Sequence, residues 1–440
     1  MAKRRNPPLT VLLNGRLVGE IRMATSGAIS FTYAEEWLAW QYAMPISRSL
    51  PLTEQPHKGA PVIAYLENLL PDNQAIRERV AAKVNASGTD AFHMLEKIGR
   101  DCVGALQFVT EYDGSTELPG IEGEKVSEDS IAHMLKNLAS APLGIEEDDD
   151  FRISIAGAQE KSALLFMNGE WFRPTGMTPT THILKTQLGV LPNGINLSDS
   201  VENEFFCMRL CKEMGVKVAH VEIHDFADTR ALVIERFDRQ WTQKGTLLRL
   251  PQEDFCQALA VPPSQKYQSD GGPSIKDSIG LLQGSNSPTE DQLAFFRAQI
   301  LFWLLAATDG HAKNYSLFLR PGNSFVMTPL YDILSAQKAV DEAQLRHGQL
   351  KLAMSLGDRG RYRVDRVAPR HFLQTAKASG IGVSLVEKLL QEIHDRIPAA
   401  IEATLAQLPP DFPEALSSSI IAGVEARHRV LGLGLAAEAR

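Results

Sequence analysis

Short apolar segments bounded by turn residues make up the first part of the chain. Leu9 to Leu13 and Arg16 to Ile21 are two such segments, and they flank Asn14-Gly15. This dipeptide favours a two-residue β-hairpin turn, because both of its positions accept a positive φ. The chain is therefore expected to open with a pair of antiparallel strands.

Helical and extended patterns are mixed in the rest of the first region. The residues from Asn73 to Val84 have a helical pattern with Asp72 as the expected N-cap, and Phe92 to Ile98 form a second, shorter one. Val103 to Val109 is expected to be a strand. The run of five acidic residues from Glu146 to Asp150 is typical of a solvated linker, so we expect a domain boundary there.

The middle region is predicted to contain strands and one long helix. Ser162 to Met167 is an apolar strand that leads into a second Asn-Gly turn, Asn168-Gly169. Thr181 to Leu184 and Ala231 to Glu235 are further strands. Asp199 to Met214 has apolar residues at helical spacing, which predicts an amphipathic helix.

The last region is predicted to be almost wholly helical. Ser287-Pro288-Thr289-Glu290 is a helix start, with Ser as N-cap, Pro at the first helical position and Glu three residues after the cap. The helix that follows, to Ala307, is apolar on nearly all sides and must be buried. Further helices are expected at Ala368 to Ala378, Val383 to Leu405 and Ala415 to Leu433.

These patterns predict an α+β protein, and the composition sets its outer limits. A chain of 440 residues is too long for one core, and its 44% hydrophobic and 22% charged residues are ordinary for a globular protein. Four cysteines give no disulfide framework. No signal peptide is recognised, and the longest apolar run, Ile300 to Ala307, is too short to span a bilayer. We therefore expect a cytoplasmic protein without a membrane segment.

The acidic net charge limits the ways in which the chain could bind nucleic acid. A net charge of −8 and a pI near 5.8 argue against unaided binding, which depends on neutralising phosphates with Lys and Arg. Contact with DNA would need a local basic patch or a basic partner. Lys377 is a candidate for a direct phosphate contact, although its neighbours Ala-Ser-Gly carry no charge.

The spacing of three polar residues near the C-terminal end of the buried helix predicts a phosphoryl-transfer site. Asp309 is followed five residues later by Asn314, a separation that lets a carboxylate face an acceptor hydroxyl while an amide oxygen holds a metal ion. Asp332 supplies a second oxygen ligand, beyond a predicted hairpin with a Pro-Gly-Asn turn. The alternative is that the three residues are a helix cap, a turn residue and a surface carboxylate.

The middle region offers candidates for nucleotide contacts. The small residues Ala156 to Ala158 allow backbone N–H groups to approach an anion, and Lys185 lies at the end of an apolar strand, where a kinase-like fold needs a cation. A simple turn and a solvated lysine remain open alternatives. Glu235 to Phe237, at the end of a strand, could offer backbone groups to an adenine. Either Glu202 or Glu204 could pair with Lys185.

Two cysteines and two histidines have a spacing that superficially suggests a zinc site. They are Cys207, Cys211, His220 and His224. The cysteines lie one helical turn apart in an apolar stripe, and the segment between the pairs is shorter than in a zinc finger. Packing is therefore the preferred interpretation.

Several longer strings in one order resemble those of the HipA family, the serine/threonine-kinase toxins of HipBA toxin–antitoxin modules. They are Asn-Leu-Leu-Pro-Asp, Ile-Gly-Arg-Asp-Cys-Val-Gly-Ala-Leu, Arg-Ile-Ser-Ile-Ala-Gly-Ala-Gln-Glu-Lys, Val-Ile-Glu-Arg-Phe-Asp-Arg, Leu-Pro-Gln-Glu-Asp, Thr-Asp-Gly-His-Ala-Lys-Asn and Leu-Tyr-Asp-Ile. The resemblance covers essentially the whole chain. It implies a two-lobed protein-kinase-like fold, with an N-terminal α/β domain over 1–145, a small-lobe region over 146–250 and a helical lobe over 251–440.

The resemblance also implies ATP and Mg²⁺ as cofactors and a role for each matching residue. Asp309 would orient and deprotonate the acceptor hydroxyl, and Asn314 and Asp332 would hold Mg²⁺. Ser154 would be an autophosphorylation site that switches the enzyme off. The residues that would contact ATP are Ala156, Gly157, Ala158, Gln159, Glu160 and Lys161 of a phosphate-binding loop, Lys185, the hinge residues Glu235, Arg236 and Phe237, and His311, Lys313, Asn314 and Asp332.

The partners that the resemblance implies are a HipB-type antitoxin dimer and a protein substrate. A toxin of the family phosphorylates glutamyl-tRNA synthetase, which inhibits translation and promotes persistence, so an aminoacyl-tRNA synthetase is the expected substrate. Operator DNA would be reached mainly through the antitoxin, with which the chain would co-repress its operon.

Three other functions stay open. A metal-dependent hydrolase could use Asp309, His311 and Asp332 as ligands, but it would leave Lys185 and Ser154 without a role. A scaffold that only co-represses would keep the fold without the chemistry. A small-molecule kinase of the aminoglycoside type has a similar Asp-to-Asn spacing, and only the family strings outside the site argue against it.

Overall fold

The computed structural model describes residues 7–115, 120–145, 151–157 and 159–438. The chain forms two compact units, each assembled from segments far apart in sequence. The first comprises Met1–Thr186, His224–Ser264 and Leu317–Phe325, and the second comprises Gln187–Ile223, Gln265–Ser316 and Val326–Arg440. The division into 1–145, 146–250 and 251–440 remains a prediction, and the acidic run at 146–150 lies outside the described residues.

The first unit contains a five-stranded sheet with the strand order β4-β3-β2-β1-β5. β1 and β2 pair antiparallel around Asn14 and Gly15, whose φ angles of 47° and 78° confirm the predicted hairpin turn. The strands are β1 (Leu9–Leu13), β2 (Arg16–Met23), β3 (Ile29–Tyr33), β4 (His57–Lys58) and β5 (Leu106–Val109). The helices that accompany them are α1 (Glu35–Leu38), α2 (Ala60–Glu67), α3 (Gln74–Lys83) and α4 (Ala91–Ile98).

Two predicted boundaries in this region are wrong. The N-cap of α3 is Asn73, whose side chain accepts hydrogen bonds from the N–H groups of Ala75 and Ile76. Asp72 instead donates its N–H to the carbonyl of Gly157. The strand predicted from Val103 begins only at Leu106, because the preceding Gly104 donates its N–H to the Asp238 carboxylate at 2.7 Å.

A second sheet follows, with the order β12-β13-β9-β7-β8-β6. The turn at Asn168 and Gly169, with φ angles of 55° and 81°, confirms the second predicted hairpin. α5 (Glu128–Lys136) packs on this sheet through Ile131 and Leu135, which join Leu164, Leu184 and Val233 in one buried cluster. The strands are β6 (Gly123–Lys125), β7 (Lys161–Met167), β8 (Glu170–Pro174), β9 (His182–Thr186), β12 (Val221–Phe226) and β13 (Thr229–Glu235). Shorter elements are η1 (Pro142–Gly144), β14 (Arg239–Trp241), β15 (Leu247–Arg249), β16 (Gln252–Asp254), α7 (Phe255–Ala258) and η2 (Pro263–Gln265).

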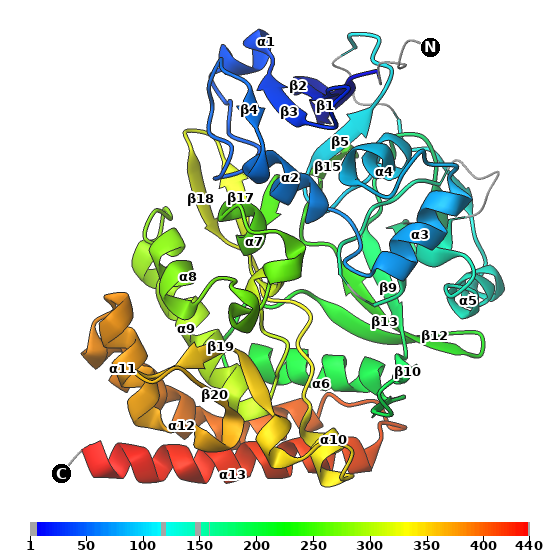
Figure 1. The fold of residues 1–440 in the computed structure, drawn as a ribbon. Helices are drawn as coiled ribbons and strands as arrows, with labels where there is room; N and C mark the ends of the chain where they lie inside the picture. Colours follow the sequence, from blue (N-terminus) through cyan, green and yellow to red (C-terminus); the bar gives the residue numbers. More distant parts are fainter. Residues whose placement is uncertain (1–6, 116–119, 146–150, 158, 439–440) are drawn as a thin grey trace. The chain divides into compact units, whose positions relative to one another are not determined.

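The second unit is mainly helical and is organised around α9 (Pro288–Leu305). This helix buries eight consecutive residues, from Ala298 to Leu305, which confirms the predicted buried helix. α13 packs against both α9 and α12, and Figure 1 shows it in red along the base of this unit. Its elements are β10 (Gly189–Val190), β11 (Asn196–Leu197), α6 (Ser200–Glu213), η3 (Gln268–Asp270), α8 (Ile275–Leu282), η4 (Ala312–Asn314), α10 (Gln337–Asp341), η5 (His347–Gln349), β19 (Lys351–Leu356), β20 (Arg361–Arg363), η6 (Val364–Arg366), α11 (Pro369–Ser379), α12 (Val383–Leu405) and α13 (Glu414–Glu438). The hairpin of β17 (Ser316–Arg320) and β18 (Ser324–Met327) follows η4 in the chain.

The hydrogen bonds at the start of α9 differ from those predicted. Ser287 occupies the N-cap position, but its side chain makes no capping hydrogen bond. The hydroxyl of Ser285 accepts the N–H of Ser287 at 3.0 Å and donates to the carboxylate of Asp291. That carboxylate also accepts the N–H of Met327 at 3.0 Å. The capping residues are therefore Ser285 and Asp291, not Ser287 and Glu290.

None of the helices described is long and apolar enough to cross a lipid bilayer.

Candidate active site

The loop after α9 carries the predicted catalytic residue in a fixed backbone. α9 ends at Leu305, and its C-cap residue, Ala306, has a left-handed φ of 52° that turns the chain away from the helix axis. The carbonyl of Asp309 accepts two hydrogen bonds, from the N–H of His311 at 2.8 Å and from Nδ2 of Asn314 at 2.7 Å. The Asp309 side chain is 53% exposed, whereas Asn314 is buried. The loop therefore presents a carboxylate to solvent from the end of a buried helix.

The Asp309 carboxylate has two neighbours in the second unit. The hydroxyl of Tyr267 donates a hydrogen bond to Oδ1 of Asp309, and Nε2 of His311 lies 3.7 Å from the same oxygen. The ring of Tyr267 packs edge-on against that of His311, with centroids 4.8 Å apart. No pattern in the sequence pointed to Tyr267, because it belongs to an irregular loop 42 residues before Asp309.

The segment that carries Asp332 is tied to the same loop. The hydroxyl of Tyr331 donates to the carbonyl of Lys313 at 2.8 Å and lies 2.6 Å from the hydroxyl of Ser316. Asp332 follows with a left-handed φ of 62°, an uncommon conformation for a residue other than glycine. Within the second unit, the segment that carries Asp332 is thus hydrogen-bonded through Tyr331 to the loop that carries Asp309, His311, Lys313 and Asn314.

Asn314 and Asp332 have the chemistry that a magnesium ion requires. Because Nδ2 of Asn314 is used for the Asp309 carbonyl, its Oδ1 points away from that bond and can accept a metal. Mg²⁺ is commonly held by one or two protein oxygens together with substrate phosphates. Among the residues described, no cluster of three or more His, Cys, Asp or Glu forms a metal site. Binding of Mg²⁺ by Asn314 and Asp332 stays a prediction.

The predicted phosphate loop belongs to the first unit, and side chains of the loop donate hydrogen bonds to backbone carbonyls. Gly157 has a φ of 115°, a backbone conformation that residues with a Cβ rarely adopt, so glycine is favoured here. Lys161 Nζ donates to the carbonyl of Ala156 at 3.0 Å. Gln159 donates from Nε2 to the carbonyl of Thr186 at 3.0 Å. Ala158 lies outside the described residues.

Two buried lysines face each other beside this loop. Lys161 on β7 is directly opposite Lys185 on β9, and the two residues are 6% and 5% exposed. Residues opposite each other in an antiparallel ladder project from the same face. Lys185 is therefore buried beside Lys161 and is not a solvated lysine, and phosphate binding by the loop stays a prediction.

The glutamates considered in the sequence analysis have different surroundings. Glu160 forms an ion pair with Arg79 at 2.7 Å in the first unit. In the second unit, Glu202 accepts a hydrogen bond from Nε2 of Gln187 at 2.7 Å, and Glu204 is buried.

Ser154, the predicted autophosphorylation site, is fully buried in the first unit. Its hydroxyl donates to the carbonyl of Leu69 at 2.8 Å, and its N–H donates to the carbonyl of Asp101 at 2.9 Å. Leu69 and Asp101 come from two of the strings that resemble the HipA family. The residues before the phosphate loop are thus fixed by segments from the N-terminal region.

The predicted hinge has a definite backbone orientation. The N–H of Arg236 donates to the carbonyl of Thr181 at 2.8 Å. The carbonyl of Glu235 belongs to the same trans peptide group as this N–H and therefore points to the opposite side, while Phe237 lies in the turn that follows β13. The carbonyl of Glu235 and the N–H of Phe237, and not the backbone groups of Arg236, are the candidates for adenine contacts.

The side chain of Arg236 is the centre of a buried ionic cluster. Its guanidinium donates to Asp238 at 2.8 Å and to Asp101 at 3.3 Å, and Asp101 also pairs with Arg239 at 2.8 Å and Arg249 at 3.1 Å. Burial would raise the pKa of Asp101, but the three guanidinium groups outweigh burial and hold that pKa well below its usual range. The cluster therefore keeps the hinge backbone in one position in the first unit.

The cysteines of the superficial zinc pattern pack in the core, as expected. Cys207 and Cys211 are fully buried on α6, and burial raises the pKa of the Cys211 thiol to about 12. His220, in the same unit, is exposed and bonds to Glu222 at 3.0 Å. Buried neutral thiols are poor metal ligands, since the thiolate is the form that binds.

Sequence comparisons identify the family. A model of the HipA N-terminal domain matches residues 9–109, and a model of the HipA-like C-terminal domain matches residues 153–401. The protein Y4mE of Sinorhizobium fredii is 34% identical over 401 residues, which cover 90% of this chain and 91% of that protein. The serine/threonine-protein kinase toxin HipA of Shewanella oneidensis is 28% identical over 425 residues, which cover 93% and 92% of the two chains.

A solved structure agrees with these matches. The Shewanella oneidensis HipA structure, determined with HipB and its operator DNA, superposes with a TM-score of 0.80 at 26% identity, over 97% of this chain and 99% of that chain. The predicted α+β, two-lobed kinase-like fold and the resemblance of the motifs are both confirmed. The chain therefore belongs to the HipA family of kinases.

Proposed function

We propose that this chain is a serine/threonine-protein kinase toxin of a type II toxin–antitoxin system, which transfers the γ-phosphate of ATP to a protein serine. The observation that carries the proposal is the loop in which Nδ2 of Asn314 donates to the backbone carbonyl of Asp309, so that the amide oxygen of Asn314 would be the atom that holds a metal. The buried pair of Lys161 and Lys185 supports it from the first unit. A hydrolase using Asp309, His311 and Asp332 as metal ligands would give these lysines no role.

Each residue contributes a separate part of the chemistry. Asp309 would orient the acceptor hydroxyl and take its proton as the oxygen attacks phosphorus. Mg²⁺, held by Asn314 and Asp332, would neutralise charge on the phosphates when it is bound. Lys161 and Lys185, with the loop around Gly157, would bind phosphate oxygens. In the second unit, His311 and Lys313 would contact phosphate oxygens.

Adenine would be held by the backbone of the hinge. The carbonyl of Glu235 and the N–H of Phe237 offer one acceptor and one donor, and the ionic cluster around Arg236 keeps them in place. Backbone recognition of this kind requires no particular side chain at either position.

Autophosphorylation of Ser154 would switch the enzyme off. Its hydroxyl donates to a carbonyl in a site with no exposed surface, so the segment has to leave that site before it can be modified. A phosphoserine carries nearly two negative charges and has no hydroxyl to donate to Leu69. The modified segment therefore cannot return, and the phosphate loop that follows it loses its support.

The proposed partners follow from the relatives. The Shewanella oneidensis structure contains HipB and operator DNA, so we infer a HipB-type antitoxin dimer as partner and a role as co-repressor. The substrate is proposed to be an aminoacyl-tRNA synthetase, with glutamyl-tRNA synthetase as the first choice, whose phosphorylation would inhibit translation and promote persistence. A cytoplasmic location fits these partners.

Intact-mass measurement of the purified protein after incubation with ATP and Mg²⁺ tests the proposal. The parent, dephosphorylated beforehand, should gain one phosphate, whereas Asp309→Asn and Ser154→Ala should gain none. Ser154→Ala should still phosphorylate glutamyl-tRNA synthetase, because it loses the acceptor and not the catalytic loop.

Other outcomes would change the conclusion. If the dephosphorylated parent binds ATP but gains no phosphate and leaves the synthetase unmodified, the chain is a co-repressing scaffold. Transfer to an aminoglycoside instead of a protein would favour a small-molecule kinase.

A further inference from the structure

The carboxylate proposed to receive the acceptor hydroxyl already accepts a hydrogen bond from another hydroxyl. Tyr267 donates to Oδ1 of Asp309, and no element of the proposed function uses this tyrosine. A carboxylate has two oxygens, so one can be held while the other faces a substrate. Tyr267 could either support Asp309 permanently or occupy the position of the acceptor hydroxyl for a time. The contacts that hold Tyr267 in place distinguish these two roles.

The loop around Tyr267 is attached on both sides within the second unit. The residue before it, Lys266, accepts the N–H of Ala312 through its carbonyl at 3.2 Å, which ties the loop to the catalytic loop itself. The residue after it, Gln268, accepts the N–H of Ser355 on β19 through its side chain at 2.8 Å. Tyr267 therefore lies between two anchored residues. One of them, Lys266, is bonded to Ala312, the residue directly after His311.

The backbone and ring of Tyr267 are also fixed. Its carbonyl accepts the N–H groups of Asp270 and Gly272, both at 3.0 Å, which closes a tight turn. Its ring lies edge-on to His311 at an interplanar angle of 88°, and His311 is almost fully buried. The adjacent residues, the carbonyl and the ring of Tyr267 all have fixed contacts. Tyr267 is therefore suited to hold the Asp309 carboxylate in one orientation.

We propose that Tyr267 is a positioning residue, which holds Asp309 through Oδ1 so that Oδ2 faces the acceptor hydroxyl. The inference rests on the proposed function, because it assigns Asp309 the role given above. Without the bond, the half-exposed carboxylate is free to rotate about its side-chain torsions, and a smaller fraction of bound complexes has the reactive geometry. ATP binding does not involve this contact, so only the transfer step should change.

Tyr267→Phe tests this role, because phenylalanine keeps the edge-on ring contact with His311 and removes only the hydroxyl. The rate of autophosphorylation is measured by intact mass on dephosphorylated protein over a range of ATP concentrations with Mg²⁺. We expect the rate at saturating ATP to fall about tenfold, which corresponds to about 1.4 kcal/mol, with the half-saturating ATP concentration unchanged. Tyr42→Phe, at an exposed tyrosine of the first unit, is the matched control and should match the parent.

Each remaining outcome overturns the inference in a distinguishable way. A faster rate in Tyr267→Phe would show that the hydroxyl occupies the place of the acceptor. An unchanged rate would show that Asp309 needs no support, and a change confined to ATP affinity or accompanied by a large fall in melting temperature would show a structural role. If the parent itself transfers no phosphate, the proposed function fails and the inference fails with it.

Discussion

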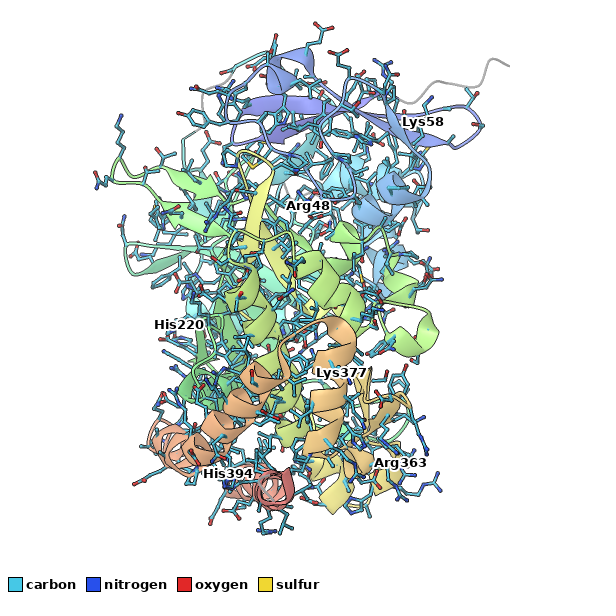
Figure 2. All side chains as sticks on the ribbon, turned by 90° about the vertical axis from the view of Figure 1, so that its left-hand side faces the viewer. Arg48, Lys58, His220, Arg363, Lys377 and His394 are labelled. Atoms are coloured by element: carbon cyan, nitrogen blue, oxygen red, sulfur yellow. The ribbon has the colours of Figure 1, made fainter. Side chains whose placement is uncertain are left out.

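Glu253 on β16 is a carboxyl group without exposed surface in the first unit. It accepts the N–H of Arg48 at 2.8 Å and the hydroxyl of Ser47, and these bonds favour its charged form. Burial is the larger effect and raises its pKa from 4.5 to about 8. Figure 2 labels Arg48, whose side chain donates to the carbonyl of Asn323, in the turn between β17 and β18, at 3.0 Å.

This raised pKa predicts that Glu253 weakens the fold as the pH increases. Between pH 4.5 and about 8 the unfolded chain has lost the proton that the folded chain keeps, so stability falls across this interval. Glu253→Gln cannot ionise and should therefore gain stability relative to the parent between pH 5 and pH 8. Each pKa unit corresponds to about 1.4 kcal/mol, so a difference of a few kcal/mol is expected.

Urea denaturation of the parent and of Glu253→Gln at both pH values measures this difference. Glu35→Gln, at an exposed glutamate on α1, is the control and should show almost no pH-dependent change. An offset between Glu253→Gln and the parent that is the same at pH 5 and pH 8 would contradict the expected ionisation.

Contacts within the candidate site were predictable from spacing alone only where the two residues are close in sequence. Asp309 and Asn314 share one short loop, so their separation alone indicated their relation. Tyr267 is 42 residues from Asp309, and Asp101 is 135 residues from Arg236, so no periodicity links them. Asp72 was misjudged for the same reason, because its backbone partner is the distant Gly157.

The cap at the start of α9 leads to a prediction about the stability of this helix. Ser285 and Asp291 form the cap, and Ser287 contributes its N–H but not its hydroxyl. Ser285→Ala should cost about 1–2 kcal/mol, because it removes a donor from a buried carboxylate and an acceptor from an N–H group. Ser287→Ala should cost less than about 0.5 kcal/mol, as for surface changes without such contacts.

The two serine variants are compared by urea denaturation and by the rate of autophosphorylation. Since α9 carries the catalytic loop at its other end, Ser285→Ala is expected to lose stability with little change in rate. Equal losses of stability in both variants would show that Ser287 caps the helix as the sequence suggested.

Elements with strong local signals were predicted well, and irregular ones were not. The Asn-Gly hairpins and α9 follow from turn chemistry and from a continuous apolar pattern. The pair of β19 and β20 was missed, because only Lys351 with Arg363 and Leu356 with Arg361 are in register and the pairing shifts between them. A strand pair of this kind has too few regularly paired residues to produce an alternation of apolar and polar residues in the sequence.

The charge of the whole molecule is distributed unevenly along the sequence. The residues 346–377 contain eight Lys and Arg and two Asp, although the chain as a whole has a net charge of −8. Figure 2 labels two of them in the second unit, Arg363 on β20 and Lys377 on α11. Arg363 donates to Asp365 at 2.6 Å, so part of this positive charge is already neutralised.

We expect the chain to contribute little to the binding of operator DNA, even though this segment is basic. Affinity for DNA falls with salt in proportion to the number of phosphates that a protein neutralises. A chain with an acidic net charge should leave that number close to the value of the antitoxin alone. The plot of log affinity against log salt concentration should therefore have the same slope for the antitoxin as for its complex with this chain.

Fluorescence anisotropy with labelled operator DNA measures the two slopes, with the chain alone as a reference that should not bind at physiological salt. Lys377→Glu provides the sharper test, because Lys377 is exposed and is the residue first suggested for a direct contact. One lost phosphate contact would make the slope shallower by about one, whereas a residue outside the interface would leave it unchanged. The expectation would be contradicted if the complex had a steeper slope than the antitoxin and Lys377→Glu made that slope shallower. That result would show that the chain itself contacts DNA phosphates, because the local positive charge on α11 outweighs the repulsion from the acidic molecule as a whole.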